Sequence, residues 1–381
     1  MRKDWEYKKL GEVANVVMGQ SPDGSNVNNE NGMEFHQGKI NFGEQFLMKS
    51  DCFTTQVTKV AEKGSILLCV RAPIGIINIT DRDICIGRGL CAIKEKTEVD
   101  NLFLYYYLLN KKLYFEKNST GSTFKAISSK VVLNTPIFLP PKPTQLAIVA
   151  ELDKLNEMIR LKKQQLEDYD QLAQSIFYEM FGDPVENEKG WEVKKLGEVC
   201  EVTSSKRIFA DDYVEKGIPF YRSKEVIEKS KNLPISVELF ITEEKYNNIN
   251  KSYGVPQIDD ILITAVGTIG KIWKVNTIEP FYFKDGNIIW IRKYNEINST
   301  YFKDSLYYLI DEFKKVNANG AAYNALTIIK LKQMQVPLPP LPLQQQFAAR
   351  IEAIERQKQQ VSETIKDLET LLASRMQYWF D

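Results

Sequence analysis

Two segments of the chain alternate hydrophobic and polar positions with the spacing of a coiled-coil helix. They cover residues 144–182 and 343–381, and each follows a proline-rich stretch, LPPKP or LPPLP. Apolar residues recur at intervals of three and four, which predicts two long helices with a continuous apolar stripe. Lys162, Lys358 and Arg375 interrupt the stripes. The expected helix-pairing core is Leu152, Leu155, Ile159, Leu166, Ile176, Ile351, Ile354, Val361, Ile365, Leu368 and Leu372.

Each long helix is preceded by a region of short hydrophobic runs typical of β-strands. Examples are GSILLCV and IGIINI in the first region, and ILITAV, IGKIWKV and NIIWIRK in the second. An aromatic amphipathic stretch follows the strands in each region, at 101–118 and 299–317. Strand runs followed by a helix predict a compact mixed α/β unit in each region, with a strand order that the sequence leaves open.

The two regions are copies of one another. WEYKKLGEV at 5–13 and WEVKKLGEV at 191–199 match at eight of nine positions. Further matches follow in order: ILLCVRAPIG with ILITAVGTIG, GSTFKAIS with GAAYNALT, and LPPKPTQ with LPPLPLQ. The offset between copies grows from 186 to 195 to 199 and then stays fixed. Insertions therefore fall in the front part of the second copy, and the later part of each copy is constant.

This pattern predicts four parts: globular domains at 1–143 and 183–342, and helices at 144–182 and 343–381. Two similar globule-then-helix units pack most simply about a pseudo-two-fold axis, which favours antiparallel pairing of the helices over packing on some other surface. The linker around Asn187 then corresponds to the chain ends, as if a circular repeat had been cut open. The LGEV phrase is expected to start the first strand of each domain.

Composition is that of a globular protein, with 43% hydrophobic and 26% charged residues. The sequence has no long apolar span and begins MRKDWEYKK, so we expect a cytoplasmic protein without a membrane anchor. Its five cysteines form no CxxC pair and are expected to be buried apolar residues. The net charge is zero, although residues 1–143 carry 19 basic and 15 acidic residues. Any binding of nucleic acid is therefore expected to be weak or shared with partners.

Known catalytic motifs are missing from the sequence. Gly267-Thr-Ile-Gly270-Lys271 lacks the first glycine and the Ser/Thr of a phosphate-binding loop, and is better interpreted as a turn between strands. There is no GxSxG motif, and both Pro-Pro pairs follow leucine, unlike the motif with which amino-methyltransferases hold a flipped base. His36 is the single histidine. We therefore expect a chain without a catalytic site or a metal site.

The ordered, duplicated motifs resemble the specificity subunit of type I restriction–modification systems. The resemblance rests on WxxKKLGEV, the glycine turn before the constant part, LPPKPTQ or LPPLPLQ, and the helix end FYEMFGD, over nearly the whole chain. The stretch MGQSPDGSNVNNENGMEFHQGKINF at 18–42 also resembles a frequent opening of the first recognition domain. The second helix departs from the pattern by ending YWFD.

The resemblance implies two target-recognition domains, each reading one half of a split, asymmetric sequence in double-stranded DNA. It implies that the antiparallel helices space these domains and dock two methyltransferase (modification) subunits for adenine methylation. Restriction subunits would join for ATP-dependent cleavage. S-adenosylmethionine, ATP and Mg are then expected on the partner subunits, with no cofactor bound by this chain.

Polar and basic residues on loops are the expected DNA-reading groups, because such side chains bind base edges and phosphates. An isolated loop residue is more often simply solvated. Three, Lys125, Tyr323 and Asn324, lie in the matched turns just before the constant part. The first-domain candidates are Gln20, Ser21, His36, Gln37, Lys39, Arg71, Arg82, Arg88 and Lys125. The second-domain candidates are Lys206, Arg207, Arg222, Lys224, Lys271, Lys284, Tyr323 and Asn324.

Two other classes of protein fit the same sequence. One is a regulatory or structural coiled-coil protein with two ligand-binding globular domains and no role on DNA. The other is an enzyme whose site has no familiar motif. Selection of a two-part DNA motif from a random library would distinguish a DNA specificity subunit from both alternatives.

Overall fold

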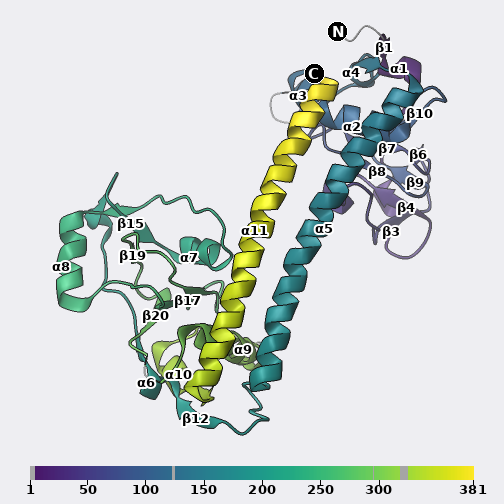
Figure 1. Cartoon of the computed structure of the whole chain (residues 1–381). Coiled ribbons are helices and arrows are strands. Elements are labelled where there is room, and N and C mark those ends of the chain that lie inside the picture. The colour runs from purple at the N-terminus through teal and green to yellow at the C-terminus, as the bar shows by residue number, and fades with distance from the viewer. Residues whose placement is uncertain (1–4, 122–124, 295, 318–324) are drawn as a thin grey trace. The chain divides into compact units, whose positions relative to one another are not determined.

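The computed structural model describes residues 5–121, 125–294, 296–317 and 325–381, which divide into two compact units. The first unit contains residues 1–164 together with 362–381, and the second contains 165–361. Both long helices are continuous across this division, α5 over Lys142–Phe181 and α11 over Leu341–Phe380. Figure 1 labels these elements. The first unit is thus completed by the last residues of the chain.

The first domain is built on a four-stranded antiparallel sheet in the order β2-β10-β7-β8. Its strands are β2 (Ala14–Met18), β7 (Ile66–Cys69), β8 (Ile77–Ile79) and β10 (Leu90–Glu95). Beside it lies a mixed sheet in the order β3-β5-β4-β9-β6, in which β4 and β9 are parallel. Its strands are β3 (Val27–Asn28), β4 (Met33–His36), β5 (Phe53–Thr54), β6 (Val60–Ala61) and β9 (Ile84–Ile86).

Strand β7 is apolar at every position because both of its faces are buried. Ile66 and Leu68 lie in one core cluster together with residues of α2, while Leu67 and Cys69 lie in another cluster. A strand covered on both faces has no polar side, so a continuous apolar run is expected. The aromatic stretch at 101–118 forms two helices, α2 (Asn101–Asn110) and α3 (Lys112–Lys117).

The second domain repeats this plan. Its central sheet has the order β13-β20-β17-β18, with a neighbouring sheet in the order β14-β16-β15-β19. The central strands are β13 (Glu201–Thr203), β17 (Ile261–Thr264), β18 (Ile272–Lys274) and β20 (Ile288–Arg292). The others are β14 (Tyr213–Val214), β15 (Ile218–Tyr221), β16 (Phe240–Ile241) and β19 (Tyr282–Phe283). Helix α9 covers Ser299–Asn317.

Two helices of the second domain have no helical counterpart in the first. These are α7 (Ser223–Ser230) and α8 (Glu243–Tyr253), which lie in the chain between β15 and β17. The equivalent connection of the first domain, between β4 and β7, contains strands but no α-helix. The front part of the second copy is therefore longer, as predicted, and contains helices where the first copy has short strands.

The entry phrase differs from the expectation in one respect. WEYKK and WEVKK form strands β1 (Glu6–Lys9) and β12 (Glu192–Lys195), and LGEV forms a single helical turn, α1 (Leu10–Val13) or α6 (Leu196–Val199), instead of starting a strand. The turn forms because the glutamate carboxylate accepts a hydrogen bond from the backbone at its start, Lys9 N–Glu12 Oε2 at 3.0 Å in the first copy.

The proline-rich lead-ins position the long helices on the domains. Strand β11 (Pro136–Leu139) pairs with β1, and β21 (Gln335–Leu338) pairs with β12. Short helices α4 (Ser129–Leu133) and α10 (Ile328–Gln333) precede these strands. The glutamine of each motif is buried: Gln145 donates to Pro140 O at 2.9 Å, and Gln344 donates to Pro339 O at 2.7 Å. Helix α5 begins at Lys142 and α11 begins at Leu341, so the offset of 199 between the two copies is preserved.

Most of the expected helix-pairing core is buried. Leu166, Ile176 and Leu372 are only partly buried, while the other expected core residues are buried. Two of the polar interruptions have acidic partners on the opposite helix. Arg375 binds Glu151 within the first unit, and Lys358 binds Asp170 at 2.7 Å within the second. A second contact in each unit gives the direction: Lys163 lies 3.5 Å from Glu369 in the first, and the Phe177 ring lies 5.6 Å from that of Phe347 in the second. Within each unit α5 and α11 therefore run antiparallel.

Candidate nucleic-acid interface

In the first domain, loops from several strands meet at one edge of the central sheet. The backbone N–H of Gly19, after β2, donates to Leu90 O at 2.9 Å, and Gln20 N donates to Ile86 O at 3.0 Å. The N–H of Arg88 donates to the hydroxyl of Ser21 at 3.3 Å. The loop after β2 and the β9–β10 turn are therefore joined, which brings Gln20, Ser21 and Arg88 together.

The loop after β4 closes onto the same turn. Gly87 N donates to His36 O at 2.7 Å. A Cβ built on Gly89 would lie 2.1 Å from Gln37 O, so only glycine permits this approach of Gln37. Lys39 lies close enough to Cys69, at the end of β7, to affect the pKa of its thiol. Burial raises that pKa to about 12, and the positive charge of Lys39 acts in the opposite direction.

The loop after β7 completes this edge. Val70 N donates to Gly89 O at 2.9 Å, and Ile127 N donates to Val70 O at 3.0 Å. Arg71 forms an isolated β-bridge with Ala126, the residue after Lys125. The side chains of Arg71 and Lys125 are both exposed here. We call this edge the first reading edge; its exposed or partly exposed candidates are Gln20, Ser21, Gln37, Lys39, Arg71, Arg88 and Lys125.

The cations of the first reading edge are available for a ligand. Lys39, Arg71, Arg88 and Lys125 make no ion pair with any residue that the structure describes, and all four side chains are exposed. Exposed guanidinium and ammonium groups held on loops over a rigid sheet are the groups that bind DNA phosphates and base edges.

The second domain builds the same backbone frame. Ala265 N donates to Asn287 O at 2.8 Å, and Leu326 N donates to Ala265 O at 3.2 Å. Lys284 N donates to Tyr221 O at 2.9 Å, as Gly87 N does to His36 O in the first domain. The β17–β18 connection is a glycine turn as predicted, with positive φ at Gly267 and Gly270.

Different side chains occupy this second frame, which we call the second reading edge. Lys206 Nζ stands 4.0 Å from the ring centroid of Tyr253, and Arg207 Nε donates to Asp285 at 3.0 Å. Lys271 is partly exposed and Lys284 exposed. Tyr253 was missed by the sequence analysis because it lies at the end of the inserted α8, which has no counterpart in the first copy to draw attention to it.

Two first-domain candidates, His36 and Arg82, have partners within the domain. His36 is buried, and its Nε2 lies 2.9 Å from Glu34 Oε1. Arg82 donates to both oxygens of Glu34, each at 2.6 Å, and to Leu47 O and Met48 O. Burial would raise the pKa of Glu34, but hydrogen bonds from Arg82, Ser50 N–H and His36 outweigh it and lower that pKa to about 2. His36 and Arg82 therefore both bind Glu34 within the domain, and a contact of either residue with DNA stays a prediction.

Arg222 likewise has acidic partners within the second domain. Its Nη2 donates to Glu225 Oε1 and to Glu238 Oε2, both at 2.9 Å, and Glu225 is buried. These hydrogen bonds raise the pKa of Arg222. Lys224 shares Glu238 at 3.2 Å, but its side chain is half exposed. Arg222 holds the start of α7, while Lys224 stays a surface candidate.

Tyr323 and Asn324, the remaining second-domain candidates, lie outside the described residues, so their placement stays a prediction.

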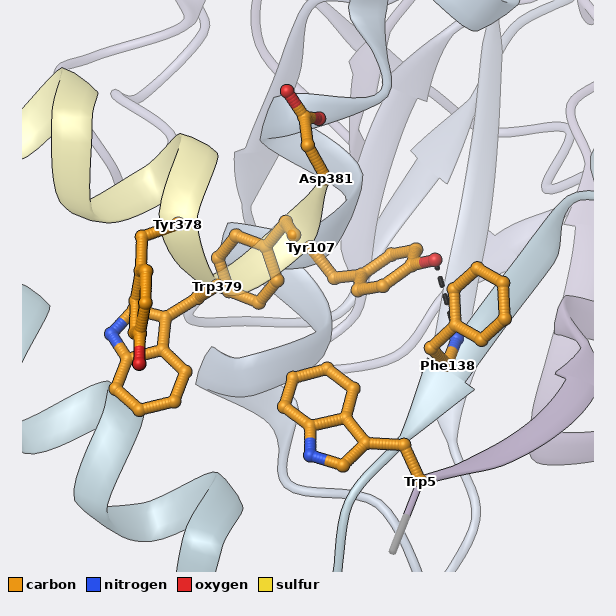
Figure 2. A pocket seen from close by; sticks show the side chains of 7 residues that line it. Trp5, Tyr107, Phe138, Tyr378, Trp379 and Asp381 are labelled. Atoms are coloured by element: carbon orange, nitrogen blue, oxygen red, sulfur yellow. Dashed lines mark hydrogen bonds between the residues drawn. The ribbon is translucent and has the colours of Figure 1, made fainter. Parts of the chain in front are cut away.

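An apolar cavity of about 310 Å³ lies in the first unit, where the end of α11 meets the domain. Figure 2 shows its lining side chains. The Phe380 ring lies 5.8 Å from that of Phe103 and 5.6 Å from that of Tyr107, whose hydroxyl accepts a hydrogen bond from Phe138 N at 3.2 Å. Asp381 is the one residue with a carboxylate side chain among the lining residues.

Neither a metal-binding cluster nor a membrane-spanning helix is present in the described part of the chain. They contain no group of three or more His, Cys, Asp or Glu side chains arranged to hold a metal ion. No described helix combines the length and apolar character needed to cross a bilayer.

The fold and the two reading edges define a chain with two copies of a domain suited to binding DNA. The family model described as "Type I restriction modification DNA specificity domain" matches residues 2–168 and again 188–370. The chain therefore belongs to the family of type I restriction–modification specificity subunits. Specificity subunits are targeting subunits without catalytic activity and carry no cofactor themselves. This membership confirms the predicted family and the two-domain mixed α/β fold.

Relatives of similar length have names that agree with this membership. The type I restriction enzyme MjaIX specificity subunit of Methanocaldococcus jannaschii is 26% identical, over 92% of this chain and 87% of that protein. A putative specificity subunit of Haemophilus influenzae is 25% identical, over 94% of this chain and 89% of that one. The putative MjaX specificity subunit of M. jannaschii is 38% identical, over 46% of this chain and 42% of that protein.

Solved structures share the fold. A chain from a study of complex assembly and conformational transition of the type I restriction–modification system aligns with a TM-score of 0.64. It is 21% identical, and the alignment covers 100% of this chain and 98% of that one. The S subunit of M. genitalium aligns with a TM-score of 0.55 and 18% identity, over 99% of this chain and 96% of that one.

Proposed function

We propose that each domain reads one half of a bipartite, asymmetric DNA target with the side chains of its reading edge. One observation carries the proposal: the same hydrogen-bonded frame recurs in both domains but presents different side chains. Val70–Gly89 and Ala265–Asn287 are equivalent backbone links, yet Arg88 projects from the first frame where Gly286 lies in the second. A repeated frame with unlike contacts suits two unlike half-sites.

The paired helices would dock two modification subunits. Their buried stripe is used in pairing, which leaves their outer surfaces for partners. On α5 that surface includes the exposed apolar residues Met158 and Leu161. We also propose that the globular domains end at residues 143 and 342 and that the first helix ends at residue 182.

The chemistry would take place on the partners. The modification subunits would methylate adenine with S-adenosylmethionine, and restriction subunits with ATP and Mg would cleave unmodified DNA. This chain's residues would bind and orient the duplex. A cytoplasmic location follows from this role. The coiled-coil regulatory protein without a DNA role has lost its support, since both domains match a DNA specificity domain.

Selection from a random duplex library tests the proposal. The chain, co-purified with its cognate modification subunit, should enrich a motif with two specified blocks separated by an unspecified gap. A chain in which Arg71 and Arg88 are both replaced by alanine should lose only one block. Failure of the wild-type complex to enrich any motif would overturn the proposal.

A further inference from the structure

The second unit contains an open cleft of about 630 Å³ that is rich in lysine. Its walls come from the end of α7, the β17–β18 turn with β18, α9, and the parts of α5 and α11 that belong to this unit. The lining lysines are Lys229, Lys231, Lys271, Lys274, Lys303 and Lys358. The lining acids are Asp170, Asp304 and Glu355.

Each acid of the cleft has a lysine partner, and two of the acids share Lys358. Lys358 Nζ lies 2.7 Å from Asp170 and 3.2 Å from Glu355, and Lys303 Nζ lies 3.5 Å from Asp304. Lys274 binds Asp259, outside the cleft, at 3.1 Å.

Three lysines remain without an ion pair to any described residue. They are Lys229, Lys231 and Lys271. Lys229 Nζ stands 5.8 Å from the centroid of the Trp273 ring, which holds it over an aromatic face without neutralising it. The cleft therefore carries excess positive charge and is suited to an anionic ligand.

The cleft is continuous with the second reading edge. Lys271 ends the β17–β18 turn, whose first residue Ala265 forms part of the reading frame, and it also lines the cleft. Helix α7 packs on β18 and carries Lys229, with Lys231 directly after its end. The first domain has no α-helix at the position of α7, so it lacks an equivalent wall among its described residues.

We propose that this cleft binds the sugar–phosphate backbone of the duplex beside the half-site that the second domain reads. Lys271, Lys229 and Lys231 contact successive phosphates and read no bases. The cleft thus adds affinity that is independent of sequence, on one side of the target only. This inference rests on the proposed function, because it extends the same DNA path beyond the reading edge.

The test compares the wild-type complex with a Lys229→Ala/Lys231→Ala variant. Binding to the selected duplex is measured from 50 to 300 mM KCl. Loss of two phosphate contacts should lower the slope of log Kd against log[KCl] by about 1.8. Affinity should fall about equally for specific and random duplexes, and the selected motif should be unchanged.

A Lys195→Ala/Lys332→Ala variant is the matched control. Both lysines are exposed and lie beside α6, at the end of β13 opposite the reading edge. The control should keep the wild-type slope.

An unchanged slope in the cleft variant would overturn the proposal. So would loss of the modification subunit during purification with unchanged DNA binding, since the cleft would then be a protein-docking site. If the wild-type complex selects no motif, the proposed function itself fails.

Discussion

The ring of Phe380, the last residue of α11, packs edge-on against Phe103 in α2 with centroids 5.8 Å apart. Phe181, the last residue of α5, packs in the same way against Tyr301 in α9 at 4.6 Å. Each long helix thus ends in the core of a domain: α11 in the first and α5 in the second. The helix of each copy therefore ends in the domain of the other copy, so the contacts follow the same circular order as the sequence repeat.

A circular permutant should therefore fold. Joining Asp381 to Met1 through a short Gly-Ser linker and opening the chain between Glu186 and Asn187 keeps the Asn187 side-chain bonds to Trp191. The permutant should unfold within a few degrees of the wild-type melting temperature, measured by circular dichroism. A control opened after Leu262, inside β17, should not fold. Collapse of the first permutant would contradict the circular arrangement.

Helix pairing should depend on Ile159, which is 6% exposed in the first unit. Replacing it by aspartate places an unpaired charge in the helix seam and should reduce stability by about 3 kcal/mol or more. Urea unfolding measures this loss, and pull-down measures loss of the modification subunit. Glu157→Ala removes an exposed pair with Arg160 and should change neither. Equal behaviour of the two variants would argue against the pairing.

Arg88 and Arg82 lie six residues apart, and their replacement by alanine should affect different properties, DNA binding for Arg88 and stability for Arg82. Arg88→Ala should weaken specific DNA binding by about 1–3 kcal/mol while leaving the melting temperature unchanged, because its exposed side chain makes no ion pair with a described residue. Arg82→Ala removes the guanidinium partner of Glu34 and should cost about 2 kcal/mol of stability. Electrophoretic mobility shifts and thermal melts of both variants check this contrast. Loss of stability in Arg88→Ala would refute the assignment.

Glu34 should make the first domain sensitive to acid. Its folded pKa of about 2 lies below the ordinary 4.5, because its hydrogen bonds outweigh the effect of burial. The stabilisation is therefore complete above pH 4.5 and is lost as the pH falls through 2. Glu34→Gln should be less stable at pH 7 but should lose less stability between pH 4.5 and 2. Urea midpoints across this window provide the measurement, and parallel curves for the two proteins would contradict it.

The sequence predicted the repeat, the helices and the strand runs because each depends on local periodicity or on matching between copies. Residues 299–317 form α9 as expected, and both long helices begin at the offset of 199. The LGEV turn was missed because a capping glutamate can favour one helical turn inside a β-rich region.

The sequence could not sort reading residues from structural ones. Arg82 and Arg88 look alike in the chain, and only folding brings Glu34 to Arg82. His36 sits in a polar stretch, yet its neighbour Phe35 pairs with Cys85 in a buried sheet and carries His36 inside. Contacts between residues far apart in sequence decide which cations remain free, and a single sequence does not encode them in a periodic pattern.

Mapping modified adenines by long-read sequencing most directly tests whether each domain reads its own half-site. The wild-type complex should modify a two-part motif. Arg71→Ala/Arg88→Ala should relax one half only, and Arg207→Ala/Lys284→Ala should relax the other half only. Relaxation of the same bases by both variants, or a single uninterrupted motif, would contradict the account.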